Sequence, residues 1–163
     1  MRQNRVWNQF RGLELNMEES RQANLKKKLD MANDLIAADH QQSNRLVLQM
    51  IELSSTPIIR FQIFNELLGE LKNQAFVHYT REELVMEVCD YPRMAEHQAS
   101  HQQQLVQLSK VSEAVRKCDQ PAVTQLMLSI FDTWQKHRID QDKKLSDYID
   151  ALNQPQDGRF SKA

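Results

Sequence analysis

Two pairs of potential metal ligands, each with a spacing of four residues, constrain the fold of this chain more than any other feature. The pairs are His78/Glu82 and His97/His101. Side chains four residues apart lie above one another on one helix face, so each pair can close on a single centre. Each pair also continues an apolar stripe, which runs through Phe64, Leu67, Leu71 and Ala75 for the first and through Leu105, Leu108 and Val115 for the second. We therefore expect two facing helices with both pairs directed into the core.

The helical pattern covers most of the chain. Apolar residues recur at three- and four-residue steps over about 18–54, 57–88, 92–117 and 121–152. Proline-containing turns separate these segments, and Pro57 is expected in the first turn of the second helix. The chain of 163 residues has only three glycines and four prolines, which favours helix over sheet. Short turns between four helices predict an all-α, up-down-up-down four-helix bundle.

The ends of the chain differ from the bundle. The first helical segment exceeds 30 residues, so we expect an extended N-terminal helix whose first half projects beyond the bundle. Residues 1–11 could be a docking arm, a peptide folded back on the bundle or a frayed end, and the last is commonest at a terminus. The predicted organisation is an arm and helical extension over 1–29, a bundle domain over 30–152 and a flexible tail over 153–163.

Composition excludes several classes of protein. A net charge of −1 gives no indication of a nucleic-acid or membrane partner. No apolar run approaches the ~20 residues of a membrane span and the N-terminus has no signal-peptide core, so a cytoplasmic protein is expected. Cys89 and Cys118 are too few for a disulfide framework and lie roughly 40 Å apart in such a bundle, so both are expected to be free. Motifs for hydrolysis or nucleotide binding are missing from the sequence.

The fourth helical segment adds His137 and Asp142. On an ideal helix a spacing of five is about 140°. With Trp134 and Leu145 at the centre of the inward face, the two side chains flank that face and could straddle a two-metal centre, whereas Asp140 points away. A surface acid paired with a lysine is the alternative for Asp142.

These ligand types suit a metal in the bundle core. A single histidine on an apolar face is more often hydrogen-bonded core, but buried charge is costly unless it is paired or bound to metal. Imidazoles with carboxylates fit iron, zinc or manganese.

Three segments resemble the bacterial hemerythrins over roughly residues 30–152. They are HYTREELVM at 78–86, YPRMAEHQASH at 91–101 and HRIDQDKKL at 137–145. The resemblance implies a four-helix bundle with two non-haem iron ions joined by an oxo or hydroxo bridge. It also implies that dioxygen or a related small ligand binds at the iron with fewer ligands. The implied terminal ligands are His97, His101 and His137 on one iron and His78 on the other, with Glu82 and Asp142 as bridging carboxylates.

The sequence departs from the family pattern at three positions. Ser43 stands where a histidine is expected, and His40 lies one turn earlier, about 60° round the helix. We expect His40 to reach the iron through a shifted or distorted helix; otherwise that iron keeps one histidine and has extra positions open to water. Arg138 replaces the usual isoleucine, and Trp134 is three rather than four residues before the histidine. A charged, wetter pocket promotes autoxidation, which favours sensing over reversible storage.

The expected function is a non-enzymatic oxygen- or redox-sensing module. Its N-terminal helix or C-terminal tail would relay the signal to a partner, or the N-terminal helix would form a homodimer. The alternatives are a diiron enzyme of the peroxidase or ferroxidase type, an oxygen storage or carrier protein, and a structural bundle whose histidines bind zinc or nothing.

Overall fold

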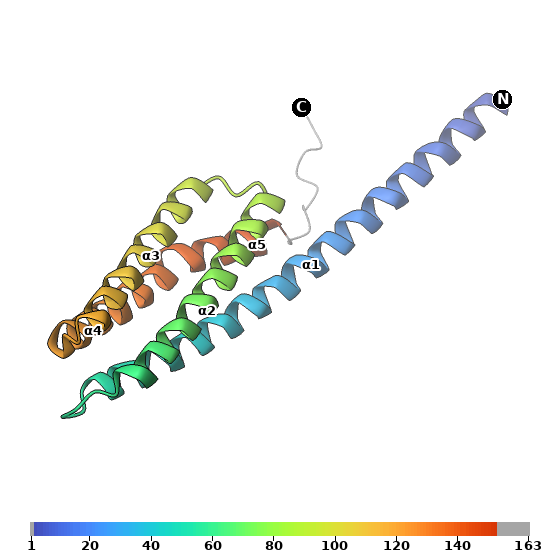
Figure 1. Cartoon of the computed structure of the whole chain (residues 1–163). Helices are drawn as coiled ribbons and strands as arrows, with labels where there is room; N and C mark the ends of the chain where they lie inside the picture. Colours follow the sequence, from blue (N-terminus) through green and yellow to red (C-terminus); the bar gives the residue numbers. More distant parts are fainter. Residues whose placement is uncertain (1, 153–163) are drawn as a thin grey trace.

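The chain is all helical over the part that the computed structural model describes, which is the backbone of residues 2–152 and the side chains of residues 20–152 (Figure 1). The tail predicted over 153–163 lies outside the described residues. The elements are α1 (Arg2–Ser54), α2 (Phe61–Val88), α3 (Met94–Arg116), α4 (Gln120–His137), a π-helical turn η1 (Arg138–Asp142) and α5 (Lys143–Leu152). The predicted all-α class is confirmed.

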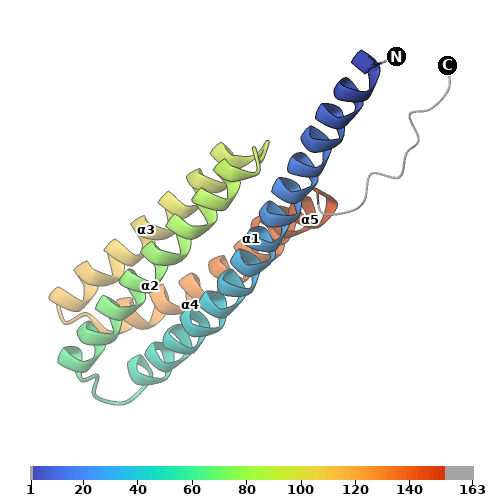
Figure 2. The ribbon, with the colours of Figure 1, turned by 90° about the vertical axis from the view of Figure 1, so that its right-hand side faces the viewer.

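The helices form the predicted up-down-up-down bundle. Helix α1 packs against α2 and α4, and α3 packs against the same two helices from the opposite corner. Successive helices run in opposite directions, and α5 continues the course of α4 past the π-helical turn (Figures 1 and 2). Within the described part, no helix is both long and apolar enough to cross a membrane.

Helix α1 is longer than expected. It begins at Arg2 and not near residue 18, so residues 2–11, for which an arm, a folded-back peptide and a frayed end were left open, continue the helix. Gly12 is the one residue of low helix propensity in this stretch, and a glycine in a helix costs only about 1 kcal/mol. The side chains of residues 20–28 are exposed, and among the side chains that the structure describes Leu29 is the first buried one. The preceding part of α1 projects beyond the bundle (Figure 2).

Helix α2 begins at Phe61, four residues later than Pro57, which lies in the connection instead. Helix α1 ends at Ser54, where side-chain hydroxyl groups bond carbonyl oxygens of its last turn. Ser54 Oγ donates to Ile51 O (2.9 Å) and Thr56 Oγ1 donates to Leu53 O (2.8 Å). The side chain of Gln120 then fixes the connection. Its Nε2 donates to Ser54 O (3.0 Å) and Thr56 O (2.6 Å).

Helices α2 and α3 end in the same way, at residues with positive φ. Asp90 (φ 51°) and Cys118 (φ 53°) lie one position past their helix caps. The next amide in each case donates back to the helix, from Tyr91 N to Met86 O (2.9 Å) and from Asp119 N to Ala114 O (3.0 Å). These are Schellman motifs, in which the position with positive φ, here Asp90 or Cys118, is usually a glycine. Cys89 is buried and Cys118 is exposed, and both are free as predicted.

Two apolar clusters fill the bundle at different heights. The larger includes Leu46, Met50, Phe64 and Ile130, and the smaller includes Leu29, Ile36, Met86, Leu145 and Ile149. On α1 the two clusters are separated by residues 37–45, which include His40. A layer of buried polar side chains lies between them, and it contains the ligand candidates.

Candidate metal centre

The structure brings all seven predicted site residues together in the middle of the bundle. His40 comes from α1, His78 and Glu82 from α2, His97 and His101 from α3, His137 from α4, and Asp142 from η1. They form two groups of potential metal ligands, and within each group the ligand atoms all lie within 4.8 Å of one another. One group is Glu82, His97, His101 and His137; the other is His40, His78, Glu82 and Asp142.

Glu82 belongs to both groups and is fully buried. Its Oε2 lies 3.1 Å from His101 Nε2, 3.2 Å from His97 Nε2 and 3.5 Å from His78 Nε2. The i,i+4 spacings predicted this convergence, because each pair projects from one face of a regular helix. A carboxylate placed between the two sets of imidazoles can bridge two cations.

Asp142 reaches the centre in a way that the sequence analysis did not predict. We expected His137 and Asp142 on opposite flanks of a regular helix, but residues 138–142 form a π-helical turn, closed by the bond from Lys143 N to Arg138 O. A π-helical turn bonds residues five apart, so positions 137 and 142 share one face. Asp142 Oδ1 consequently lies 2.9 Å from His137 Nε2 and 3.1 Å from His97 Nε2. Asp140 belongs to neither group.

His40, rather than Ser43, faces the centre from α1. Its Nε2 lies 2.9 Å from Asp142 Oδ2, and its ring centroid lies 4.5 Å from that of His78. No distortion of α1 is needed, since the helix is continuous from Arg2 to Ser54. His40 is also the most exposed of the seven, with 19% of its side chain accessible. Ser43 is buried one turn away and lines an adjoining cavity.

The chemistry of the donor set fits metal ions. Eight buried nitrogen and oxygen atoms of these residues lack a hydrogen bond of suitable direction, although ion-pair contacts bring several of them within 3.1 Å of one another, and they include both ring nitrogens of His97 and both carboxylate oxygens of Asp142. The remaining four are His40 Nε2, His78 Nδ1, Glu82 Oε1 and His137 Nε2. Buried polar atoms are normally hydrogen-bonded, and several at one place indicate an additional partner. Five imidazoles and two carboxylates in a buried layer fit iron or zinc better than calcium or magnesium.

Burial and mutual attraction shift the pKa values of these groups in a metal-free chain. Burial lowers the pKa of His78 to about 4, although Glu82 opposes the shift. Burial would raise the pKa of Glu82, but its contacts with His101 and His97 outweigh it and the pKa falls to about 2. Burial would lower the pKa of His97, yet Asp142 and Glu82 raise it to about 9. The pKa of Asp142 is strongly lowered in spite of burial, because His137, His40 and His97 surround it.

Three further side chains orient the imidazoles, and the sequence analysis missed them. Glu83 Oε1 lies 3.0 Å from His101 Nδ1, and Ser100 Oγ lies 2.8 Å from His137 Nδ1. Asp39 Oδ2 lies 3.8 Å from His78 Nδ1, and Asp39 is held by Arg81 and by Gln74 (3.1 Å). Hydrogen bonds such as those of Glu83 and Ser100 fix the tautomer and orientation of histidines that bind metal, whereas Asp39 is too far from His78 for a hydrogen bond and acts through its charge. Glu83 follows Glu82 and Asp39 precedes His40 in the sequence, and this adjacency is the one feature by which the sequence could have indicated their role.

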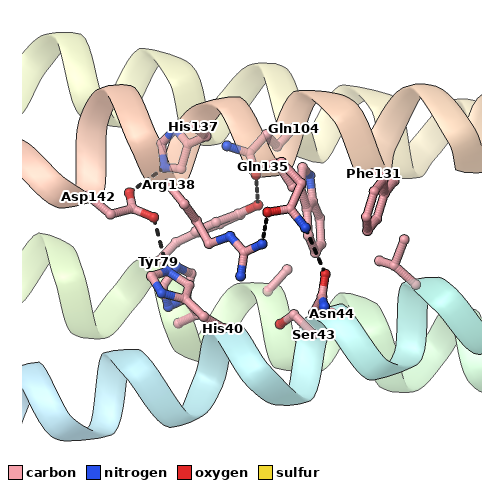
Figure 3. A pocket seen from close by; sticks show the side chains of 14 residues that line it. His40, Ser43, Asn44, Tyr79, Gln104, Phe131, Gln135, His137, Arg138 and Asp142 are labelled. Atoms are coloured by element: carbon pink, nitrogen blue, oxygen red, sulfur yellow. Dashed lines mark hydrogen bonds and ion pairs between the residues drawn. The ribbon is translucent and has the colours of Figure 1, made fainter.

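A small cavity borders the half of the site that contains His40 and His78. It has about 30 Å³ of space for a water-sized sphere, and Ser43, Asn44, Gln135 and Arg138 are among its polar lining residues (Figure 3). Arg138 donates to Gln135 Oε1, and Gln135 Nε2 donates to Asn44 Oδ1 (3.0 Å). A wider groove of about 290 Å³, between α1 and α5, reaches His40, Arg138 and Asp142 from the other side. The charged pocket expected from Arg138 is therefore present.

The chain matches a known protein family over most of its length. The sequence profile described as the hemerythrin HHE cation binding domain matches residues 31–152, which include all seven site residues and most of the chain. Searches of curated proteins and of solved structures gave no significant match.

Proposed function

We propose that this chain, which belongs to the hemerythrin HHE cation binding domain family, holds two iron ions and senses dioxygen or redox state. The observation that carries the proposal is the pair of ligand groups that share Glu82. His97, His101 and His137 would hold one ion, and His40 with His78 would hold the other. Glu82 and Asp142 would bridge them, since each lies within 3.5 Å of histidines from both sets. Two iron ions would supply one-electron redox chemistry and coordination positions open to a small ligand.

The protein residues around the centre exclude water and set ligand geometry. Six of the seven ligand candidates are buried, and apolar clusters lie on both sides of them along the bundle. In such surroundings the charges of the carboxylates and of the ions act on each other more strongly than in water. A change of charge at the centre therefore alters the forces on His40 and His78.

Helix α1 supports sensing rather than storage. It carries His40 into the centre, and Asp39 on the same helix lies beside His78. Among the described elements, α1 also continues past the bundle (Figure 1). A shift of α1 that follows the state of the centre would be available to a partner outside the bundle. Coupling of 1–3 kcal/mol is typical of such switches.

Metal analysis and spectroscopy test the proposal. Protein purified without added metal is expected to contain up to two iron ions per chain, and diffraction data at the iron absorption edge should place them between the two ligand groups. The iron-loaded protein is expected to show an oxygen-dependent near-ultraviolet charge-transfer band that reduction abolishes. A zinc-loaded or metal-free protein without this band would contradict the proposal.

A peroxidase-type enzyme is the second candidate, and the exposure of His40 to the wider groove favours it. A reductant or peroxide could approach the centre by that route. Sustained turnover of hydrogen peroxide with a reductant would support the enzyme, whereas a sensor should show a single oxidation per chain and little turnover.

A further inference from the structure

Five large apolar side chains are exposed along the line where α1 and α2 meet. They are Met31 and Leu35 on α1 and Val77, Leu84 and Val88 on α2, and between 45% and 59% of each is accessible. Single exposed apolar residues are common on protein surfaces, but a contiguous group of them marks an interaction site. Whether these five are contiguous depends on the sides of the two helices from which they project.

The ion pair of Asp39 with Arg81 identifies the side of α1 that borders α2. Leu35 and Met31 precede Asp39 by four and eight residues, so they project from the same side of α1 as Asp39. Both are exposed, whereas Asp39 is buried, so they lie on the outer part of this side.

The same ion pair identifies the side of α2 that borders α1. Val77 precedes Arg81 by four residues, and Leu84 and Val88 follow it by three and seven, so all three project from the side of Arg81. The two helices run in opposite directions, which brings Leu84 to the level of Leu35 (Figure 1). The five residues therefore form one surface, which we call the α1/α2 patch.

The projecting part of α1 continues the patch in sequence. Steps of seven residues lead from Ala38 through Met31 to Asn24, Met17 and Phe10. Because α1 is one continuous helix, positions seven apart stay on one side and drift by only ~20° per step. In both views the projecting part has no other described helix beside it (Figures 1 and 2). A seven-residue apolar repeat is typical of two helices that wind around each other.

Two features indicate that the second helix is α1 of another copy. A single asparagine in such a repeat, here Asn24, is used to fix the register of a pair of parallel, identical helices. The area is also suitable. Each half-exposed side chain of the α1/α2 patch can bury on the order of 100 Å², so the patch supplies roughly half of the ~800 Å² per partner of a stable interface. A parallel second α1 would contact the projecting part as well and bury the rest.

We propose that two copies of this chain form a parallel dimer in which α1 of each copy packs along α1 of the other and covers the exposed residues of α2. Leu35 of one copy then lies at the level of Leu84 of the second copy. The proposal specifies the homodimer expected from the N-terminal helix. It is independent of the proposed function, since no residue of the α1/α2 patch belongs to a ligand group.

The dimer is expected to have a dissociation constant in the micromolar range, because the positions three residues after those of the repeat are polar at Ser20, Lys27 and Asp34. Sedimentation equilibrium of the full chain should show twice the 19.2 kDa of one copy at high concentration. Leu35→Glu should raise the dissociation constant at least tenfold, because a charge would be buried in the interface.

Leu48→Glu is the matched control for this variant. Leu48 is 46% exposed on the same helix, and its position lies about 220° round α1 from Leu35. Val88→Lys, which tests the α2 side of the patch, should weaken the dimer as Leu35→Glu does. Leu128→Lys, at an exposed position of α4, should not.

Disulfide formation tests the parallel register. In Cys118→Ala protein, Asn24→Cys should form a disulfide between two copies on mild oxidation, since position 24 of each copy faces its equivalent. Ala37→Cys, which borders the groove between α1 and α5, should not. A single-copy mass at every concentration would overturn the proposal, and so would equal weakening by Leu35→Glu and Leu48→Glu. Equal disulfide yields at positions 24 and 37 would overturn the parallel arrangement.

Discussion

At the scale of single residues, three of the five imidazoles proposed as ligands contact a neighbour that belongs to neither ligand group. Glu83 and Ser100 lie within hydrogen-bond distance of Nδ1 of His101 and His137, and Asp39 lies 3.8 Å from Nδ1 of His78. A hydrogen bond to Nδ1 fixes the tautomer and leaves Nε2 free for a metal, and the negative charge of Asp39 favours the proton of His78 on the same nitrogen. The two halves of the site therefore depend on different supporting residues, and a substitution can weaken one half alone.

Asp39→Asn is expected to lower affinity for a metal at the site proposed for His40 and His78 by about 10-fold, the lower end of the usual effect of losing a supporting carboxylate, because Asp39 acts on His78 through its charge. Affinity for a metal at the site proposed for His97, His101 and His137 should be unaffected. Metal titration followed by mass spectrometry of the intact protein measures occupancy of each site. Glu66→Gln, at an exposed position of the same helix as His78, is the control. Equal loss of both metals would contradict the assignment.

Metal binding is expected to release about one proton from His97 at pH 7. The pKa of His97 is raised to about 9 in the metal-free chain, so the ring is protonated at neutral pH and the metal must displace that proton. His78 and Glu82, with pKa values of about 4 and about 2, have no proton to lose there. The part of the metal affinity that depends on the His97 proton should rise with pH up to about 9 and stay constant above it, where His97 is already neutral. Titration in weak buffer with a pH indicator checks it, and the absence of release would contradict it.

The residue pairs on α2 and α3 were predictable because their spacing is a local property of one helix. His78 with Glu82 and His97 with His101 needed no tertiary information. Asp39 was not predictable in the same way, since its role depends on how α1 is placed against α2. The choice of His40 over Ser43 also depended on the rotation of α1, which the pattern left open.

At the scale of elements, η1 decides how α4 contributes to the site. A π-helical turn amounts to one extra residue in an otherwise regular helix. The five-residue spacing of His137 and Asp142 was a signal for such a turn, but RIDQD contains no glycine or proline to mark a break. The turn was therefore not foreseen.

Deletion of Ile139, an exposed residue within η1, is expected to restore a regular helix. His137 and Asp142 would then be four apart and still share one face, so the protein should fold and retain metal. Deletion of Asn73, exposed in the regular part of α2, should instead rotate the following residues by about 100° and abolish metal binding. Circular dichroism and metal analysis compare the two. A loss of metal in both would contradict this account of η1.

Cys118→Gly is expected to stabilise the protein by about 1 kcal/mol. Cys118 has a φ of 53°, and a side chain in this region costs about 1–2 kcal/mol that glycine avoids. The residue is exposed, so little packing is lost. Urea unfolding measures the gain, and Cys118→Ala, which keeps a Cβ atom, should show none.

At the scale of the whole molecule, the bundle should not depend on the extension of α1. The side chains of residues 20–28 are exposed, whereas Leu29 and Ile36 belong to an apolar cluster. Removal of residues 1–28 is expected to leave thermal stability and metal content nearly unchanged. Removal of residues 1–36 should destabilise the bundle by about 3–6 kcal/mol, because two buried side chains are lost. Similar unfolding temperatures for both shortened chains would contradict the conclusion that the contribution of α1 to the bundle begins at Leu29.

The architecture of the bundle was predictable because apolar periodicity and proline-containing turns specify four helices and short connections. The ends of the helices were less predictable. The connection between α1 and α2 is stabilised in a non-helical form up to Phe61 by the hydroxyl groups of Ser54 and Thr56 and by the side chain of Gln120. These contacts exist only in the folded chain. The length of α1 was underestimated, since a single glycine does not end a helix.

The unbroken course of α1 has a mechanical consequence. From His40 to Arg2 the helix spans 38 residues, or roughly 57 Å at ~1.5 Å per residue. If such a rigid helix tilts about a point near His40, each degree of tilt displaces its N-terminal end by roughly 1 Å. A tilt of a few degrees, too small to disturb the packing around His40, would thus move the N-terminal end of α1 by several ångströms. A displacement of this size is large enough to form or break a contact with a neighbouring molecule.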